Sequence, residues 1–415
     1  MTVFTPEWRV KINGTTVTTI TLVNLTITSG RQTIYEQPSA SYCNLTLITD
    51  PSQSVDYDIN DSITIEVKKS NGSYVNLFGG FVSDISVTVT NAGTIQVRQE
   101  VRIVALGAIA RLVRSNFIGN LSANNDGDQM LEVLQGLLFA SWNEVPGSLT
   151  WNNYEPTTQW QDAENTGLGE IDTPGDYSLA ALSNLDQSVY SLATQIANSG
   201  LGYFYEDSQG RIGYADSTHR AQYLAANGYV DLDARQAFGS GMTILKRAGD
   251  VRNSLSIIYG ATGNQSVEDE DLASIALYGE LAWVVNTHLQ NQTDAQDQAT
   301  FYLEIRAFPQ YEMPSITFPL GNPEIDNADR DALLQVFMGQ PLNIQNLPSN
   351  MTLGEYQGFV EGWTWRAGVK GLSLELTLSP IAFSLQAFRW NSVPVGETWN
   401  SISPTLDWLN ATIVA

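Results

Sequence analysis

The sequence has 415 residues, of which 43% are hydrophobic, so it is long enough to form roughly two to four domains with buried cores. It carries 44 acidic residues against 20 lysines and arginines, and the formal charge of −24 argues against a protein that holds nucleic acid by its phosphates. The single cysteine, Cys43, excludes intramolecular disulfides and cysteine-based zinc clusters, and no run of about 18 apolar residues suggests a membrane span.

Residues 1–112 show the alternation of apolar and polar residues that is typical of β-strands. Turn-forming residues separate these stretches, as in Asn71-Gly72 and Gly79-Gly80. We therefore expect this region to form a first antiparallel β-barrel or sandwich. The apolar positions of the three clearest strands are Val23, Leu25 and Ile27; Ile63, Ile65 and Val67; and Ile85, Val87 and Val89.

Residues 113–238 combine helical and strand-like patterns, which predicts a mixed α/β insert domain. Its first helix follows Asp126-Gly127-Asp128, where an aspartate can cap the helix, and Leu131, Leu134 and Leu138 keep helical spacing. An EF-hand calcium loop is a poor alternative for this stretch, because the positions that would have to supply carboxylates do not carry them.

A second helix is predicted from the apolar stripe that runs from Leu179 to Ile196 and ends at Asn198-Ser199-Gly200. The sequence that follows, GYFYEDSQGRIGYAD, is typical of two short strands. We expect these strands to form a hairpin that turns at Ser208-Gln209-Gly210.

Residues 239–386 return to strand-like patterns such as MTILKRAG and RNSLSIIYG, which predicts a second β-barrel domain. A helix is predicted within it at 293–307, where Thr293 and Gln296 have the spacing of a capping box and Pro309 follows the end. The last strand is LSLELTLSP, with Leu374, Leu376 and Leu378 on one face.

Two segments repeat one tryptophan pattern, and six of the ten tryptophans belong to them. The internal copy holds Trp142, Trp151 and Trp160, and the terminal copy holds Trp390, Trp399 and Trp408. A nine-residue step places successive side chains on opposite faces of a regular strand or helix, so the chain has to reverse between them. Pro146-Gly147 lies midway between the first two tryptophans and predicts a hairpin that pairs them.

The terminal copy belongs to a Trp-rich C-terminal arm, residues 387–415, which follows the last predicted strand. A lone hairpin is marginally stable in water, so its indole rings need a surface to cover. A neighbouring subunit or another protein is one such surface, and the arm's own barrel is the other. We take these six tryptophans as candidate interface residues.

The sequence offers little material for catalysis, and we expect no catalytic residues, no metal site and no cofactor. There are only two histidines, His219 and His288, which is too few for a His-rich metal site. A Ser-His-Asp triad at His219 would have to use its neighbours Asp216 and Ser217. Adjacent residues of one loop do not reach triad geometry, so we expect His219 to be a surface residue.

Sugar binding or hydrolysis is a further possibility, because Glu155 and Asp162 lie beside the aromatic rings of the internal tryptophan segment. The terminal copy has Ser403 where the internal copy has Glu155, so the shared pattern concerns the tryptophans alone.

Several stretches, taken in order, resemble the tail-hub proteins of tailed bacteriophages. The first is DYDINDSITIEVKKSNGSYVNLFGGFVSDISV, from Asp56 to Val87. It is followed by the hairpin sequence GYFYEDSQGRIGYAD, by RAGDVRNSLSIIYG and SIALYGE, and by the closing YQGFVEGWTWRAGVKGLSLELTLSP. Phe78-Gly79-Gly80 and Gly358–Gly362 are the matching elements of the two halves.

The resemblance implies an α+β, mainly β fold with two tube-like antiparallel β-barrel domains, the mixed insert and the arm. It also implies a structural virion protein at the phage tail tip, made in the host bacterial cytoplasm. Such a hub forms a trimeric ring between the tail tube or distal-tail ring and the tip or fibre proteins. DNA passes through the channel of the ring and is not bound, which the acidic balance favours.

Two alternatives remain open on this evidence. The chain could be another tail component, such as a distal-tail ring protein or a receptor-binding tail-tip protein. It could also be an unrelated glycan-binding β-protein. A native assembly of three copies favours the hub, whereas six copies favour the distal ring.

Overall fold

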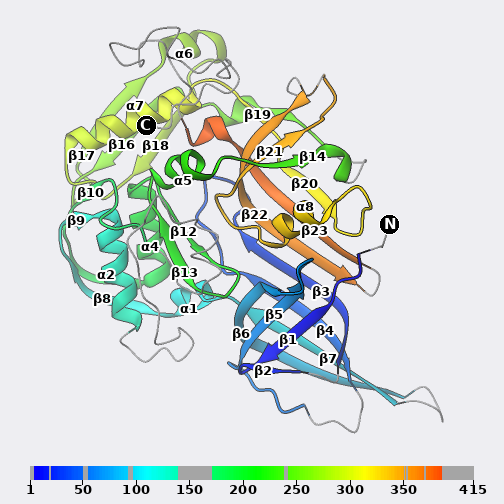
Figure 1. The fold of residues 1–415 in the computed structure, drawn as a ribbon. Helices are drawn as coiled ribbons and strands as arrows, with labels where there is room; N and C mark the ends of the chain where they lie inside the picture. The colour runs from blue at the N-terminus through cyan, green and yellow to red at the C-terminus, as the bar shows by residue number, and fades with distance from the viewer. Residues whose placement is uncertain are drawn as a thin grey trace.

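The computed structural model describes most of the chain. The described residues are 4–17, 20–49, 55–91, 97–138, 171–237, 242–349, 351, 354–368 and 371–385. Both tryptophan segments, with all six candidate interface tryptophans, lie outside these ranges. Figure 1 shows a strand-rich half, which contains the N-terminal strands, beside a half in which helices accompany smaller sheets.

A 12-stranded sheet forms the strand-rich half. The N-terminal region contributes β1 (Trp8–Ile12), β2 (Thr15–Thr16), β3 (Ile20–Gly30), β4 (Tyr42–Thr49), β5 (Ser62–Lys68), β6 (Tyr74–Asn91) and β7 (Val97–Leu106). Later residues contribute β14 (Val230–Asp233), β20 (Ser315–Pro319), β21 (Pro341–Gln345), β22 (Tyr356–Gly368) and β23 (Gly371–Pro380). The order is β14-β21-β22-β3-β4-β7-β6-β5-β1-β2, with β23 beside β22 and β20 beside β23.

Strands β3 and β22 join the two strand-rich regions into this one sheet. They pair antiparallel from Gly362 opposite Gly30 to Gly368 opposite Asn24. The predicted class, α+β and mainly β, is confirmed. Among the described strands the pairings follow an open path from β14 to β2, so two separately closed barrels are not seen there.

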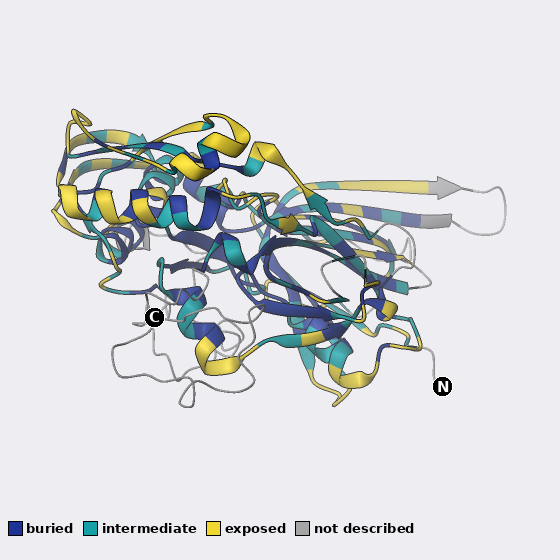
Figure 2. Ribbon diagram, turned by 90° about the horizontal axis from the view of Figure 1, so that it is seen from above, coloured by how far each residue is buried: buried dark blue, intermediate teal, exposed yellow. Residues whose placement is uncertain are grey.

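The predicted alternation places the core correctly along most of the sheet. Ile63, Ile65 and Val67 are fully buried, as are Leu374 and Leu376, and Cys43 is a buried core residue. Val87 and Val89 differ, because their side chains are exposed. Strand β6 is longer than its neighbour β5. The two strands pair only as far as Phe81 of β6, and beyond that residue β6 pairs with β7 alone. Figure 2 shows this pair of strands projecting beyond the rest of the sheet.

The other half combines the insert with a later segment of the chain. The insert, together with the few residues that precede it, contains α1 (Ile109–Arg114), β8 (Asn116–Leu121), β9 (Asn124–Asn125), α2 (Asp126–Leu138), β10 (Ser178–Leu179), β11 (Leu182–Ser188), α4 (Val189–Ser199), β12 (Tyr203–Glu206), β13 (Ile212–Ala215) and α5 (His219–Asn227). The later segment contains β16 (Ser254–Tyr259), β17 (Gln265–Glu270), α6 (Leu272–Tyr278), β18 (Ala282–Asn286) and α7 (Gln292–Arg306). Side chains of β16, β17 and α7 share one core with α2, α4 and the β12–β13 hairpin.

Two of the predicted helices need comment. The helix predicted from the stripe between Leu179 and Ile196 is wrong in its first half, which forms β10 and β11. The helix α4 begins only after Ser188, whose side chain accepts a hydrogen bond from the backbone N–H of Ser191. Helix α7 lies where a helix was predicted, but its N-cap is Asn291 rather than Thr293.

Candidate functional site

The described residues contain no group of three or more histidine, cysteine, aspartate or glutamate side chains that could hold a metal ion. The expectation that His219 is a surface residue is wrong, because it is fully buried and its Nδ1 lies 2.6 Å from Asp172 Oδ2. That partner comes from a distant part of the sequence, which is why the local pattern did not reveal it. The Ser217 hydroxyl donates to Asp176 at 2.5 Å.

The buried carboxylate of Asp126 also forms hydrogen bonds that hold parts of the fold together. It is the first residue of α2 and accepts hydrogen bonds from Tyr177 N at 2.9 Å and from the Tyr214 hydroxyl at 2.5 Å. Burial raises the pKa of Asp126 to about 7, although these two hydrogen bonds act in the opposite direction. The carboxylate thereby ties the start of α2 to two other segments of the insert.

The strongest buried ionic cluster centres on Glu361 of β22. Its carboxylate accepts two hydrogen bonds from Arg220 of α5, Nη1 to Oε1 at 2.8 Å and Nη2 to Oε2 at 2.9 Å. Arg31, which follows β3, donates Nε to Oε2 at 2.7 Å, and the Ser379 hydroxyl donates to Oε1 at 2.5 Å. Because both arginines and Glu361 are almost fully buried, the cluster locks α5 against the large sheet.

Glu361 is ionised in this environment. Burial alone would raise the pKa of its carboxyl group, but the charges of Arg220 and Arg31 outweigh burial and lower the pKa to about 2. The aromatic ring of Tyr203 lies beside the same guanidinium groups, with its centroid 4.7 Å from Arg220 Cζ. The carboxylate of Glu361 is therefore held in its ionised form by a buried ion-pair network.

Glycines allow the close backbone contacts around this cluster and at a second place. Gly30 has a φ of +83°, and a Cβ there would overlap the Glu361 carbonyl oxygen. In β6, a Cβ on Gly79 would overlap the backbone of Gln209, at the tip of the β12–β13 hairpin. The element at 78–80 thus marks where the insert hairpin touches the sheet, whereas the contact of Gly30 with Glu361 brings β3 and β22 together within the sheet.

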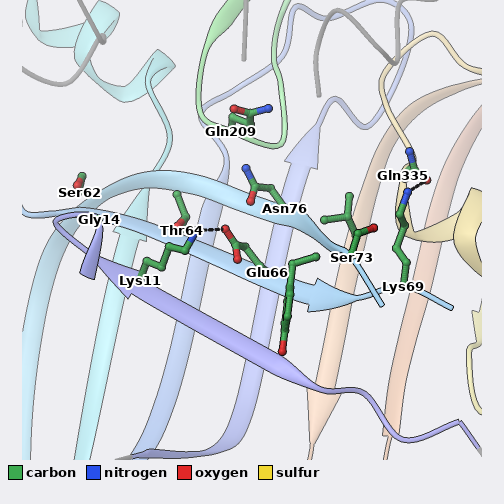
Figure 3. Close-up of a pocket in the computed structure, with 12 residues that line it drawn as sticks. Lys11, Gly14, Ser62, Thr64, Glu66, Lys69, Ser73, Asn76, Gln209 and Gln335 are labelled. Atoms are coloured by element: carbon green, nitrogen blue, oxygen red, sulfur yellow. Dashed lines mark hydrogen bonds and ion pairs between the residues drawn. The ribbon is translucent and has the colours of Figure 1, made fainter. Parts of the chain in front are cut away.

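A polar cavity of about 580 Å³ opens on the outer side of β1, β5 and β6 (Figure 3). Lys11 donates to Glu66 at 2.7 Å, and Arg9 also donates to Glu66. Lys69 donates to Gln335 at 2.8 Å. The charged groups in this cavity are thus engaged by neighbouring side chains and are not arranged as a prepared binding site.

A second cavity, of about 380 Å³, lies between β18, α7 and the segment after β3. We call it the arginine cavity, because four arginines and one aspartate line it in a chain whose acidic residues outnumber its basic ones. The lining residues that matter below are Arg31, Arg220, Arg252, Arg306, Tyr35 and Trp283. Arg31 and Arg220 share a salt bridge with the single carboxylate of Glu361, whereas among the described residues neither Arg252 nor Arg306 forms a salt bridge.

Arg306 is the most unusual member of this cavity, with an exposed fraction of only 4%. Its Nη2 donates to the Phe383 carbonyl oxygen at 3.1 Å, but no residue in the described part of the chain forms a hydrogen bond with its Nε or Nη1. The Cζ atom lies 3.7 Å from the centroid of the Phe383 ring and 5.1 Å from that of Tyr35. Aromatic faces therefore hold the guanidinium group in place while two of its nitrogens remain unpaired.

Exposed apolar side chains surround the arginine cavity and the neighbouring helix α6. Trp283 and Val284 of β18 are 40% and 55% exposed, and the Trp283 ring lies 6.5 Å from that of Tyr35. The other large exposed apolar residues of this region are Leu272, Leu277 and Tyr278 of α6, followed by Phe308 and Tyr311. Exposed aromatic clusters of this kind are typical of protein interaction surfaces.

The sequence did not single out these residues. The interface candidates chosen from it were the six tryptophans, which lie outside the described residues, so that prediction stays a prediction. Trp283 was not chosen because it stands alone, without the nine-residue repeat. The signal that could have found this surface is the pairing of an uncharged strand, AWVVN, with arginines in an otherwise acidic chain.

No protein-family model matches the sequence, and no curated protein matches it either. Solved structures of tail proteins do share the fold. A tail protein from Neisseria meningitidis MC58 is 12% identical and has a TM-score of 0.60, and the match covers 92% of this chain and 98% of that one. The 43 kDa tail protein of prophage MuSo2 from Shewanella oneidensis is 9% identical, with a TM-score of 0.53 and coverages of 91% and 98%.

Prophage tail protein gp18 from Listeria monocytogenes EGD-e is likewise 9% identical, with a TM-score of 0.50 and coverages of 90% and 95%. At these identities the comparison establishes the fold. The resemblance to phage tail proteins inferred from the sequence is thus confirmed at the level of the fold, over almost the whole length of both chains. Among the helices that the structure describes, none is both long and apolar enough to cross a membrane.

Proposed function

We propose that this chain is a structural protein of a phage tail, the hub that joins the tail tube to the tail tip. The single observation that carries the proposal is the fold, which solved tail proteins share over more than nine tenths of both chains. Exposed aromatic residues around β18 supply surface for protein partners, and the buried carboxylate of Glu361 is held in an ion-pair network that joins α5 to the large sheet.

In this proposal three copies form a ring whose channel lets DNA pass, and the chain performs no chemistry of its own. The formal charge of −24 supports the channel, because like charge keeps phosphate from adhering. The native mass of the purified chain, measured by analytical ultracentrifugation, is expected to be three times its 45.5 kDa, with ring-shaped particles in electron micrographs. A ring of six copies would indicate a distal-tail ring protein instead, and a monomer at all concentrations would contradict both assignments.

A further inference from the structure

We propose that the edge of β18 and the adjacent arginine cavity bind an extended, acidic segment of a partner protein. The segment adds to the small sheet as a strand beside β18, and one of its carboxylates enters the cavity and meets Arg252 and Arg306. The inference rests on the proposed function, an assembly protein with protein partners, and it states the chemistry of one such partner.

The backbone edge of β18 is the first part of the argument. Within the three-stranded sheet β17-β16-β18, the described pairings give β18 a single neighbour, β16, from Ser254 opposite Ala282 to Ile258 opposite Asn286. The strand AWVVN carries no charge and no proline, the usual devices that prevent an edge strand from pairing further. The opposite edge, β17, has those charges in Glu268, Asp269 and Glu270. One edge of the sheet is thus protected, and the other is open to strand addition.

The cavity supplies the second part, because β18 forms one of its walls through residues 283–286. Arg306 also lines the cavity, and among the described residues its buried Nε and Nη1 atoms have no hydrogen-bond partner. Arg252 directs its Nη1 to backbone carbonyls at 2.6 and 2.8 Å and keeps an unpaired Nε, and its Cζ lies 4.6 Å from the Trp283 ring. Buried guanidinium nitrogens without partners are costly, and a carboxylate satisfies them with charge-assisted hydrogen bonds.

The chemistry of the site favours an acidic polypeptide over a polyanion such as DNA. Asp216 also lines the cavity, and the chain as a whole has 24 more negative than positive charges, so a long run of phosphates is repelled. A single carboxylate flanked by β-branched or aromatic side chains meets four arginines against one aspartate in the cavity, together with the exposed rings of Tyr35 and Trp283. Strand addition supplies main-chain hydrogen bonds, and the cavity supplies the specificity for an acidic residue.

The test uses the full chain and a fluorescently labelled, end-blocked peptide, Thr-Val-Thr-Glu-Thr-Val-Thr, with binding measured by fluorescence anisotropy. The matched peptide has Gln in place of Glu, and we expect it to bind at least tenfold more weakly, because it cannot form charge-assisted hydrogen bonds with the arginines. The variants R252S and W283T are expected to weaken binding of the Glu peptide by a similar factor. The control R102S, an exposed arginine of β7, is expected to leave it unchanged.

Amide hydrogen exchange locates the peptide on the chain. We expect slower exchange in residues 282–286 when the Glu peptide is added and no change in residues 265–270 of the opposite edge. Equal affinity of the two peptides, no binding, or protection elsewhere would overturn the inference. The inference would also be overturned if, without peptide, amide exchange in residues 282–286 became slower as the protein concentration rose, because a second copy of the chain would then cover the edge. Faster exchange there after removal of the C-terminal arm would assign the edge to that arm. The peptide outcomes do not alter the native mass of the full chain, which tests the proposed function separately, whereas a second copy on this edge would raise that mass.

Discussion

Glu361 of β22 and Arg220 of α5 are joined by two parallel hydrogen bonds of 2.8 and 2.9 Å, although 141 residues separate them in the sequence. Neither side chain is accessible to solvent to any useful extent. A bidentate pair in this setting fixes both the distance and the orientation of the two elements. It therefore determines how the insert sits on the large sheet, and with it the position of the arginine cavity, which Arg220 also lines.

Replacing Glu361 by Gln is expected to lower the free energy of unfolding by about 3–5 kcal/mol, because it leaves Arg31 and Arg220 buried without their counter-charge. The matched control is Glu375→Gln, which breaks the exposed pair with Arg366 and is expected to cost about 0–1 kcal/mol. Both are measured by denaturant unfolding. Similar losses for the two variants would show that the buried network does not lock the insert to the sheet.

The pKa of Glu361 predicts how the same contact responds to acid. A folded-state pKa of about 2, below the unfolded value of about 4.3, means that its stabilisation is complete above the unfolded pKa and disappears as the pH falls to 2. The shift corresponds to about 3 kcal/mol. We expect the free energy of unfolding of the unmodified chain to fall more between pH 5 and pH 2 than that of Glu361→Gln. Parallel curves for the two proteins would contradict the assignment.

Asp126 predicts a change of the opposite sign at higher pH. Its pKa is raised to about 7 by burial, so its contribution is present below the unfolded pKa of about 3.9 and is lost as the pH rises through 7. Asp126→Asn is therefore expected to reduce the decline in the free energy of unfolding between pH 5 and pH 8. Part of the decline in the free energy of unfolding is expected to remain in the variant, because burial also raises the pKa values of Asp207 and Glu312 to about 7. An unchanged decline in the variant would exclude Asp126 as its source.

The sequence predicted the local structure well where the pattern is strict. Alternation identified the buried faces of β5 and β23, because a strand with one face in the core requires it at every second position. Gly210, with a φ of +82°, lies in the turn predicted for the β12–β13 hairpin. The helix predicted from the apolar stripe at Leu179 was wrong at its start. The three-residue spacing of the leucines also fits a strand whose pairing is interrupted at Asn184, where φ is +54°.

Contacts between distant segments were beyond the reach of the sequence pattern. The pairing of β22 with β3 and the meeting of Arg31, Arg220 and Glu361 depend on tertiary structure, which no local periodicity encodes. The charged residue in GFVEGW does carry a signal, since a glutamate inside an apolar, glycine-flanked strand requires a buried partner. What the sequence could not provide was the identity of that partner. The same reason explains why the arginine cavity was missed.

Gly79 offers a test of the contact between the hairpin tip and β6. Gly79→Ala places a Cβ against backbone atoms of Gln209, which cannot rotate away as the end of a side chain could, and we expect a loss of about 1–3 kcal/mol in the free energy of unfolding. Gly249→Ala is the control, because a Cβ there has open space, and its effect is expected to stay within about 0.5 kcal/mol. If Gly79→Ala behaves like the control, the hairpin does not rest on β6 in solution.

The Trp-rich C-terminal arm is expected to act between copies or between this chain and a tail partner. A chain truncated at Phe388 should keep its free energy of unfolding as a monomer but lose its native assembly, because Trp390, Trp399 and Trp408 each bring about 150–250 Å² of aromatic surface to a contact. Replacing those three tryptophans by serine in the full-length chain provides the matched control for chain length and should give the same result. Equilibrium ultracentrifugation measures the assembly, and denaturant unfolding at low concentration measures the monomer. If the assembly persists while the monomer becomes less stable, the arm packs on its own subunit, which is the alternative that the sequence left open.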